Sequence, residues 1–210
     1  MALISVSNNA LQNITAVPAS VASGALILLS TQTANSSASI EFTSGIDSTY
    51  DSYIFSFINL NPDTATQFRF NGSANGGVNY NQNIQSTAFQ SFHREDDSST
   101  SLNYRAGDDL TNGTDTDGNP NSYAILTNTV GSNSDESCSG YLQIFNPSST
   151  TYVKHFISRI QVYYNRTGSD SASHEQYYAG YFNTTSAINA FDFKFNTGNF
   201  DGVIKLYGVK

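Results

Sequence analysis

The sequence has no tryptophan, a single cysteine and few charged residues. Because Cys138 is the only cysteine, no disulfide can form within the chain, and the fold must be held by its core or by contacts between subunits. Charged residues make up 12% of the 210 residues, against about 25% in typical soluble domains. Serine, threonine and asparagine supply the polarity instead, and they favour strands and turns over helix interiors.

Basic residues are scarce even among the few charges. Nine Lys and Arg stand against 17 Asp and Glu, giving a formal net charge of −8, and the first basic residue is Arg69. Nucleic acids and anionic lipids are bound by clustered positive charge, so we expect neither a nucleic-acid nor a membrane partner. Residues 1–23 lack the basic start of a secretory signal, and the apolar run 25–29 is too short to span a bilayer.

Tyrosine and phenylalanine are abundant, with 13 and 14 copies, and from residue 25 onward they alternate with polar residues. Tyr53, Phe55 and Phe57 share one face of an extended chain, whereas no segment has a long helical period. The pattern predicts an all-β fold, an antiparallel β-sandwich of jelly-roll type with an extended N-terminal arm. The expected strands are 25–31, 38–42, 53–59, 66–70, 87–93, 102–105, 123–129, 140–145, 152–164, 176–183, 190–195 and 203–209.

Turn-forming residues separate these segments. Asn71-Gly72, Asn112-Gly113 and Asn146-Pro147 are typical turn pairs. The stretch 196–199 lies between the last two expected strands and predicts a C-terminal hairpin. The chain therefore divides into an arm, residues 1–24, and a sandwich body, residues 25–210, with a long acidic loop region around 94–121.

The arm is uncharged and too interrupted to fold as a stable helix by itself. We expect it to dock on a neighbouring subunit or on a larger assembly, and addition of a strand to an exposed sheet edge is a reasonable mode. The side chains that would make this contact are the apolar ones, namely Leu3, Ile4, Val6, Leu11, Ile14 and Val17.

One stretch resembles a calcium loop. Asp115, Asp117 and Asn119 alternate in a manner that could place oxygen ligands around Ca²⁺. The EF-hand pattern requires Gly at its sixth position and Glu at its twelfth, where Pro120 and Leu126 stand. An acidic turn is the favoured interpretation, with a weak surface Ca²⁺ site as the alternative.

No catalytic constellation is evident in the sequence. Glu95, Asp96 or the loop from Asp108 to Asp117 could supply the two carboxyls of a glycan depolymerase, but consecutive acids are more often solvated surface. The three histidines lack metal-ligand spacing, and acids precede Cys138, which disfavours a nucleophilic thiolate. We therefore expect no enzymatic activity and no cofactor.

Tyrosines predict an interaction surface. Tyr163-Tyr164 and Tyr177-Tyr178 put aromatic rings on both faces of two strands. One face can belong to the core, and the other would meet a partner, a sister subunit or a sugar ring. Tyr163, Tyr178 and Tyr181 are the candidate contact residues, although a strand packed on both sides would explain the pattern equally well.

Several stretches resemble virion-associated proteins of tailed bacteriophages, particularly marine ones. The resembling segments cover most of the chain from about residue 25 onward: residues 29–50 (from Leu-Ser-Thr-Gln-Thr), 53–60 (Tyr-Ile-Phe-Ser-Phe-Ile-Asn-Leu), 142–156, 179–185 (Ala-Gly-Tyr-Phe-Asn-Thr-Thr) and 202–210 (Gly-Val-Ile-Lys-Leu-Tyr-Gly-Val-Lys). The resemblance implies a β-rich body on a variable N-terminal anchor, tail-fibre-like or structural in role, and it supplies no catalytic residues.

The resemblance leads to one expected function and one alternative. Because the chain has no shaft repeat and no heptads, we expect a capsid-surface decoration or knob protein held by its arm. The alternative is a tail fibre or tail appendage that recognises host surface glycans. The expected partners are other virion proteins and further copies of the chain, for example in a trimer. The expected location is the virion, assembled in the host cytoplasm.

Overall fold

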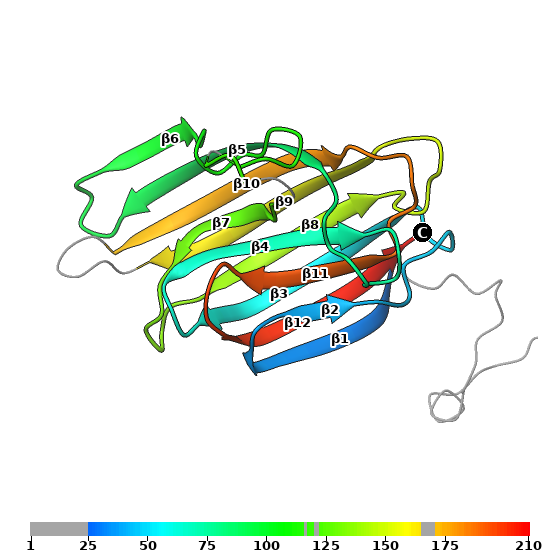
Figure 1. The fold of residues 1–210 in the computed structure, drawn as a ribbon. Helices are drawn as coiled ribbons and strands as arrows, with labels where there is room; N and C mark the ends of the chain where they lie inside the picture. Colours follow the sequence, from blue (N-terminus) through cyan, green and yellow to red (C-terminus); the bar gives the residue numbers. More distant parts are fainter. Residues whose placement is uncertain (1–24, 116, 120–121, 165–170) are drawn as a thin grey trace, which may run out of the picture.

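The computed structural model describes residues 25–115, 117–119, 122–164 and 171–210, and these fold into two antiparallel sheets packed as a sandwich (Figure 1). The residues of the expected arm, 1–24, lie outside the described part. In what is described, no helix has the length and apolar character needed to cross a bilayer.

Twelve strands make up the described part of the chain. They are β1 (Leu26–Ser37), β2 (Ile40–Phe42), β3 (Ser52–Pro62), β4 (Thr66–Ser73), β5 (Ile84–Arg94), β6 (Thr100–Tyr104), β7 (Ala124–Val130), β8 (Cys138–Phe145), β9 (Lys154–Tyr164), β10 (Ala172–Phe182), β11 (Ala190–Phe195) and β12 (Phe200–Val209). Each corresponds to a segment that the sequence pattern predicts.

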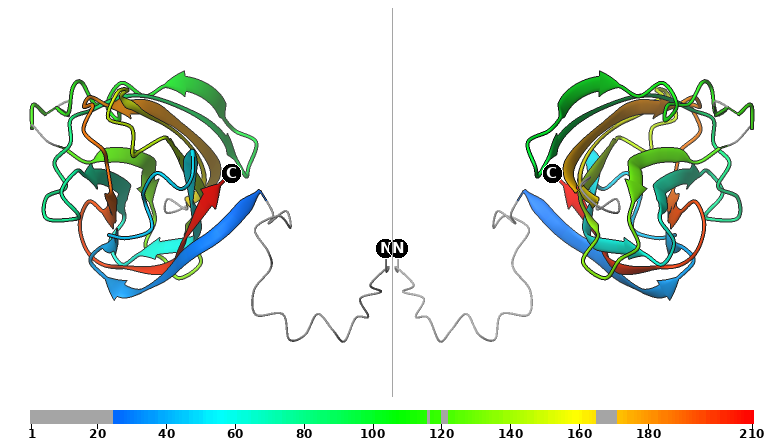
Figure 2. Two further views of the ribbon diagram at one scale, coloured as in Figure 1. Left: turned by 90° about the vertical axis from the view of Figure 1, so that its right-hand side faces the viewer. Right: turned by 90° about the vertical axis from the view of Figure 1, so that its left-hand side faces the viewer.

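The strand order is that of a jelly roll with four added strands. The larger sheet runs β1-β12-β3-β8-β9-β10-β5-β6, and the smaller sheet runs β2-β11-β4-β7. The pairs β1–β12, β2–β11, β3–β8 and β4–β7 are nested, as in one long hairpin wrapped into two layers, which is the jelly-roll arrangement. Strands β5, β6, β9 and β10 continue the larger sheet beyond β8, and Figure 2 shows its twist from β1 to β6.

Phenylalanine fills the space between the two layers. Phe193 of β11 lies among the rings of five others, with centroid distances of 4.8 to 6.2 Å, most of them edge-to-face or tilted. Such geometries are preferred by aromatic quadrupoles. The partner rings of Phe193 are Phe42, Phe55, Phe57, Phe68 and Phe70.

β3 and β12 bulge at the same place. Asn59 has a φ of 49° and Gly202 a φ of 135°, and the pairing register shifts at both positions. A Cβ at Gly202 would lie 2.8 Å from the Asn59 carbonyl oxygen, so the close approach requires glycine. The bulge shifts the inward–outward alternation of side chains along β3 by one residue. Phe57 and Leu60, three positions apart, therefore both point inward.

The C-terminal hairpin predicted from residues 196–199 is wrong. β11 belongs to the smaller sheet and β12 to the larger one, so this turn carries the chain from one layer to the other. Gly198 adopts a φ of 78°, and the Asn199 N–H donates to Asp63 Oδ1 at 3.0 Å. Turn chemistry locates a reversal of the chain but not the sheet that the next strand joins.

The acidic region 94–121 folds back onto the added strands. After β6, Arg105 N–H donates to the Ala88 carbonyl oxygen at 2.9 Å, and Ser86 N–H donates to that of Leu110 at 3.1 Å. Leu110 is 1% exposed. The described residues that follow β6 therefore cover the inner side of β5 and β10. These two strands lie beyond β7, the edge strand of the smaller sheet (Figure 1).

Candidate functional site

The outer face of the larger sheet holds most of the exposed apolar surface. We use "outer face" for the strand positions that point away from the smaller sheet. Eleven large hydrophobic side chains are exposed in the described residues; Val78 and Tyr152 lie in loops, and the other nine lie on the outer face. These nine are Leu26, Leu28, Ile58, Phe89, Leu102, Tyr104, Tyr141, Phe145 and Ile157.

An aromatic row crosses the middle of this face. Pairing registers align Tyr141, Arg159, Tyr177, Phe89 and Tyr104 on five neighbouring strands, β8, β9, β10, β5 and β6. The rings of Phe89 and Tyr177 stack with centroids 4.6 Å apart and planes inclined by 7°. The Arg159 guanidinium lies 5.5 Å from the centroid of the Tyr177 ring, a cation–π contact. The row therefore offers flat apolar rings beside a fixed positive charge.

The outer face is poor in charge. On the described strands its carboxylates are Glu175, which pairs with the Arg159 guanidinium, and Asp201 near one end of β12, which accepts from the Ser36 N–H. This ion pair raises the pKa of Arg159 and lowers that of Glu175. Lys205 of β12 is the other Lys or Arg on these strands that points outward. The excess of acidic residues lies in the loops, because Glu41 and Asp192 of the smaller sheet are balanced by Arg69 and Lys194.

The predicted tyrosine contacts divide between the two faces. Tyr163 and Tyr181 lie on the outer face and are partly exposed. Tyr178 is 2% exposed and points inward, so its prediction as a surface contact is wrong. Its side chain packs with Ala88 and Ile125 beneath the folded-back loop. Period-two alternation showed that neighbouring tyrosines face opposite ways, but it did not show which of them was outside.

Asp108 fixes the folded-back loop and is not available as a free catalytic acid. It is 3% exposed, and its carboxylate accepts from Arg105 Nε at 2.8 Å and Gln67 Nε2 at 3.2 Å. The Tyr178 hydroxyl lies 3.5 Å from the same carboxylate, and burial raises the pKa of that hydroxyl. This arrangement is a buried ion pair that ties the loop to β4 and β10.

The other acids of the region lie in exposed turns. Glu95, Asp96 and Asp97 occupy the reversal between β5 and β6, where Asp97 Oδ1 accepts from His93 Nε2 at 3.0 Å and the Asp97 side chain is 89% exposed. Hydrogen bonds from Ser98 lower the pKa of Asp96, which favours the ionised form. These three side chains therefore lie in an exposed turn, as solvated surface carboxylates do.

Asp115 closes a turn upon itself. Its carboxylate accepts from the backbone N–H groups of Asp117 (3.1 Å) and Asn119 (2.9 Å), and from the Asn119 side-chain amide and the Ser122 hydroxyl. These donors lower the pKa of Asp115. Asn119 turns its N–H₂ group toward the carboxylate, an orientation that suits an anion and not a cation. The geometry supports the acidic turn, and the described residues contain no cluster of three or more metal-ligating side chains.

Two buried groups lie away from the outer face. Cys138 is 1% exposed on the inner side of β8, and burial raises the pKa of its thiol, which keeps it protonated. Asp192 of β11 is 4% exposed on the outside of the smaller sheet, where Tyr123 donates to its Oδ2 at 2.8 Å. Burial, and then the Glu41 carboxylate on the paired strand, raise the pKa of Asp192.

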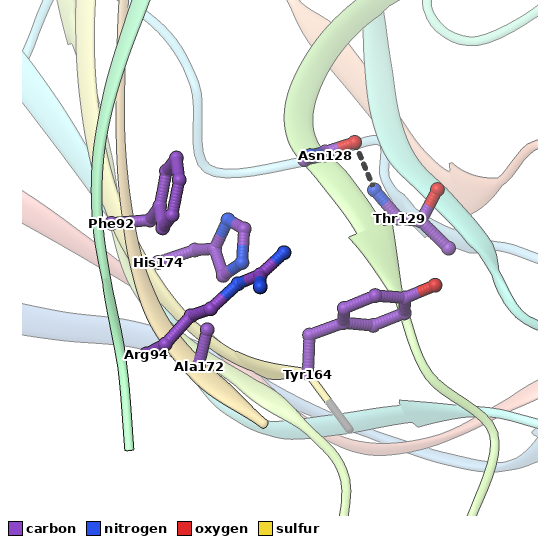
Figure 3. Close-up of a pocket in the computed structure, with 7 residues that line it drawn as sticks. All are labelled: Phe92, Arg94, Asn128, Thr129, Tyr164, Ala172 and His174. Carbon is purple, nitrogen blue, oxygen red and sulfur yellow. Dashed lines mark hydrogen bonds between the residues drawn. The ribbon is translucent and has the colours of Figure 1, made fainter. Parts of the chain in front are cut away.

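A cavity of about 270 Å³ opens between β7 and the ends of β5, β9 and β10 (Figure 3). The His174 imidazole stacks on Phe92 at 5.4 Å, and burial lowers its pKa. The residues that line the cavity are Phe92, Arg94, Asn128, Thr129, Tyr164, Ala172 and His174.

Sequence reasoning missed the apolar part of the outer face. It pointed to Tyr163 and Tyr181, which are partly exposed, whereas Phe89, Leu102 and Ile157 are more exposed parts of the same surface. One signal was present in β9. Phe156 and Ile160 point into the core, and Ile157 points outward, so apolar residues occupy both faces of this strand. Apolar residues on both faces of a strand indicate a second covered or partner-binding surface.

The predicted contact residues of the arm, Leu3 to Val17, lie outside the described residues. Comparison of the chain with protein-family models, with curated proteins and with solved structures finds no match.

Proposed function

We propose that the chain is a non-enzymatic structural protein of the surface of a tailed-phage particle, with capsid decoration as its leading role. The observation that supports this most is the outer face, an apolar and charge-poor surface on an otherwise acidic body. Surfaces of this kind are typical of proteins that work inside an assembly. The resemblance of the body to virion-associated proteins supports the particle as that assembly.

In this proposal residues 1–24 attach the body to the shell. The described chain begins at Ala25, whose carbonyl oxygen accepts from the Lys210 N–H at 3.3 Å, so both ends of the body lie at one corner. An anchor that enters there leaves the two sheets and the acidic turns free to project. The apolar side chains from Leu3 to Val17 make the contact with the shell or a neighbouring subunit.

Symmetry-averaged imaging of purified virions tests the role. Decoration predicts hundreds of copies on the shell lattice, and deletion of residues 1–24 then removes the protein from the capsid while the body still folds. A few to a few dozen copies at the tail would contradict decoration and favour the alternative role.

The alternative is a tail fibre or tail-appendage module that binds host surface glycans. The stacked rings of Phe89 and Tyr177, flanked by Arg159 and Glu175, favour it, because sugar rings pack on aromatic faces and their hydroxyls bond to charged side chains. It predicts that the protein binds host cells or purified host polysaccharide, and that Tyr177→Ala abolishes binding whereas Tyr152→Ala, in a loop outside the face, does not.

A further inference from the structure

We propose that the outer face is the contact between two copies of this chain, packed sheet against sheet about a two-fold axis. The inference goes beyond the virion role and does not depend on where the protein sits on a particle. It rests on three properties of the face: its composition, the arrangement of its few charges and its size.

The composition is that of an interface core. The nine exposed large hydrophobic residues of the outer face include Phe89, Tyr104, Tyr141 and Phe145. Aromatic residues are enriched, and acidic and lysine residues depleted, at the centres of protein interfaces. In an acidic protein, a broad face whose strands carry only two carboxylates, Glu175 and Asp201, lets two copies approach each other with little repulsion.

The central charges are complementary to a second copy of themselves. Arg159 on β9 and Glu175 on β10 are neighbours near the middle of the eight-stranded sheet. A two-fold axis that passes between them brings Arg159 of each copy over Glu175 of the other, so four charges form a closed alternating set. Isologous contacts are self-complementary in this way, and a partner of another kind would need to supply the same pattern independently.

The size of the face matches a stable dimer. The eight strands contain 79 residues, and at about 4.8 Å by 3.3 Å for each residue the face covers about 1,250 Å², enough for a standard interface. A standard interface buries about 800 Å² on each partner. Two twisted sheets pack with aligned strands at about 10 Å, a separation that the side chains of both faces fill.

Sedimentation velocity of the recombinant full chain across a concentration series measures the state directly. We expect a dimer, and we expect Ile157→Asp, in the middle of the face, to raise the dimer dissociation constant about 30-fold or more, as for a buried hot-spot residue. Val78→Asp and Tyr152→Asp place the same charge on exposed apolar residues outside the face, and both should leave the dimer intact.

A charge swap provides a second test that is independent of apolar packing. Arg159→Glu alone should weaken the dimer, because it opposes like charges across the axis, and adding Glu175→Arg should restore it. Circular dichroism and the thermal melt of each variant report whether the body is folded. The proposal is overturned by a chain that stays monomeric at high concentration, by a trimer, by a dimer that Ile157→Asp leaves unchanged, or by a monomer that binds glycan through Tyr177.

Discussion

The larger sheet is covered in two different ways along its length. From β1 to β8 its inner side faces the smaller sheet, and the space between them is filled by phenylalanine. Over β5 and β10 it faces the folded-back loop, and the buried side chains include Ser86, Gln90, Gln176 and the loop's Asp108. One half is closed by sheet-on-sheet packing alone, and the other by a smaller apolar cluster together with hydrogen bonds and an ion pair. The same strand pattern thus supports two kinds of interior.

The first test of this contrast removes the centre of the phenylalanine cluster. Phe193→Ala deletes a ring that contacts five others, and we expect it to lower the free energy of unfolding by about 4 kcal/mol, the cost of a large buried cavity. Urea denaturation measures the change. Tyr152→Ala, at a loop side chain that is 69% exposed and lies outside the outer face, should cost less than about 1 kcal/mol in the same experiment. Equal losses from the two variants would contradict the contrast.

The second test breaks the polar half. Asp108→Ala leaves the guanidinium of Arg105 and the amide of Gln67 without their acceptor, and we expect a loss of about 2 kcal/mol, because Arg105 is partly exposed. Hydrogen exchange should accelerate at the Leu110 and Ser86 amides more than in β11. Asp97→Ala, at a side chain that is 89% exposed, is the control and should change neither quantity. A uniform acceleration throughout the sandwich would show that the two halves unfold as one unit.

The third test concerns a second buried carboxylate. Asp108 is paired with the Arg105 guanidinium, whereas burial and the neighbouring Glu41 carboxylate disfavour the ionised form of Asp192. The pKa of Asp192 is raised above its ordinary value of 3.8, so the folded state binds this proton more tightly than the unfolded chain does. The free energy of unfolding therefore falls as the pH rises from the unfolded pKa of Asp192 through its folded pKa. Below the unfolded pKa the side chain is protonated in both states, and its burial then has no such cost. Asp192→Asn keeps the acceptor for Tyr123 and should raise the melting temperature at pH 7.5 but not at pH 3.5. Asp51→Asn, an exposed control, should not show this difference.

The smallest effect concerns the thiol between the two halves. Cys138 pairs with Val162 of β9 and Leu60 of β3, and burial raises the pKa of its thiol. We expect a thiol reagent such as DTNB to react with the native protein only at the rate of global unfolding, and with the urea-unfolded chain at once. Fast labelling of the native chain would show that β8 and β9 separate readily, at the boundary between the two kinds of interior.

The sequence predicted strands better than their partners. Alternation in segments such as β3 and β11 identified all twelve strands, because half-buried strands impose a period of two. It could not predict that residues 196–199 join two sheets, since turn residues specify a local reversal and not a tertiary destination. In the region 94–121 it predicted the short strand within a long acidic loop, but not that Leu110 and Asp108 are buried, because their burial depends on contacts with strands distant in the sequence.

The candidate surface was predicted only in part, for the same physical reason. Period two places Tyr177 and Tyr178 on opposite sides, but both sides of β10 carry aromatic residues, so local pattern cannot tell the core from the outer face. The stack of Phe89 on Tyr177 joins residues 88 positions apart in the sequence. Only the order of strands in the sheet reveals that these side chains form one row.

The nested order of strands also sets a condition on synthesis. β1 pairs only with β12 in the larger sheet, and β2 only with β11, so the first two strands lack their partners until residues 190–209 have left the ribosome. At about 5–20 residues per second, the nascent chain waits about 10–30 s with its first strands unpaired. A chain that ends some twenty residues early lacks β11 and β12 and cannot complete either sheet. Its exposed strand edges would make it a substrate for chaperones and proteases.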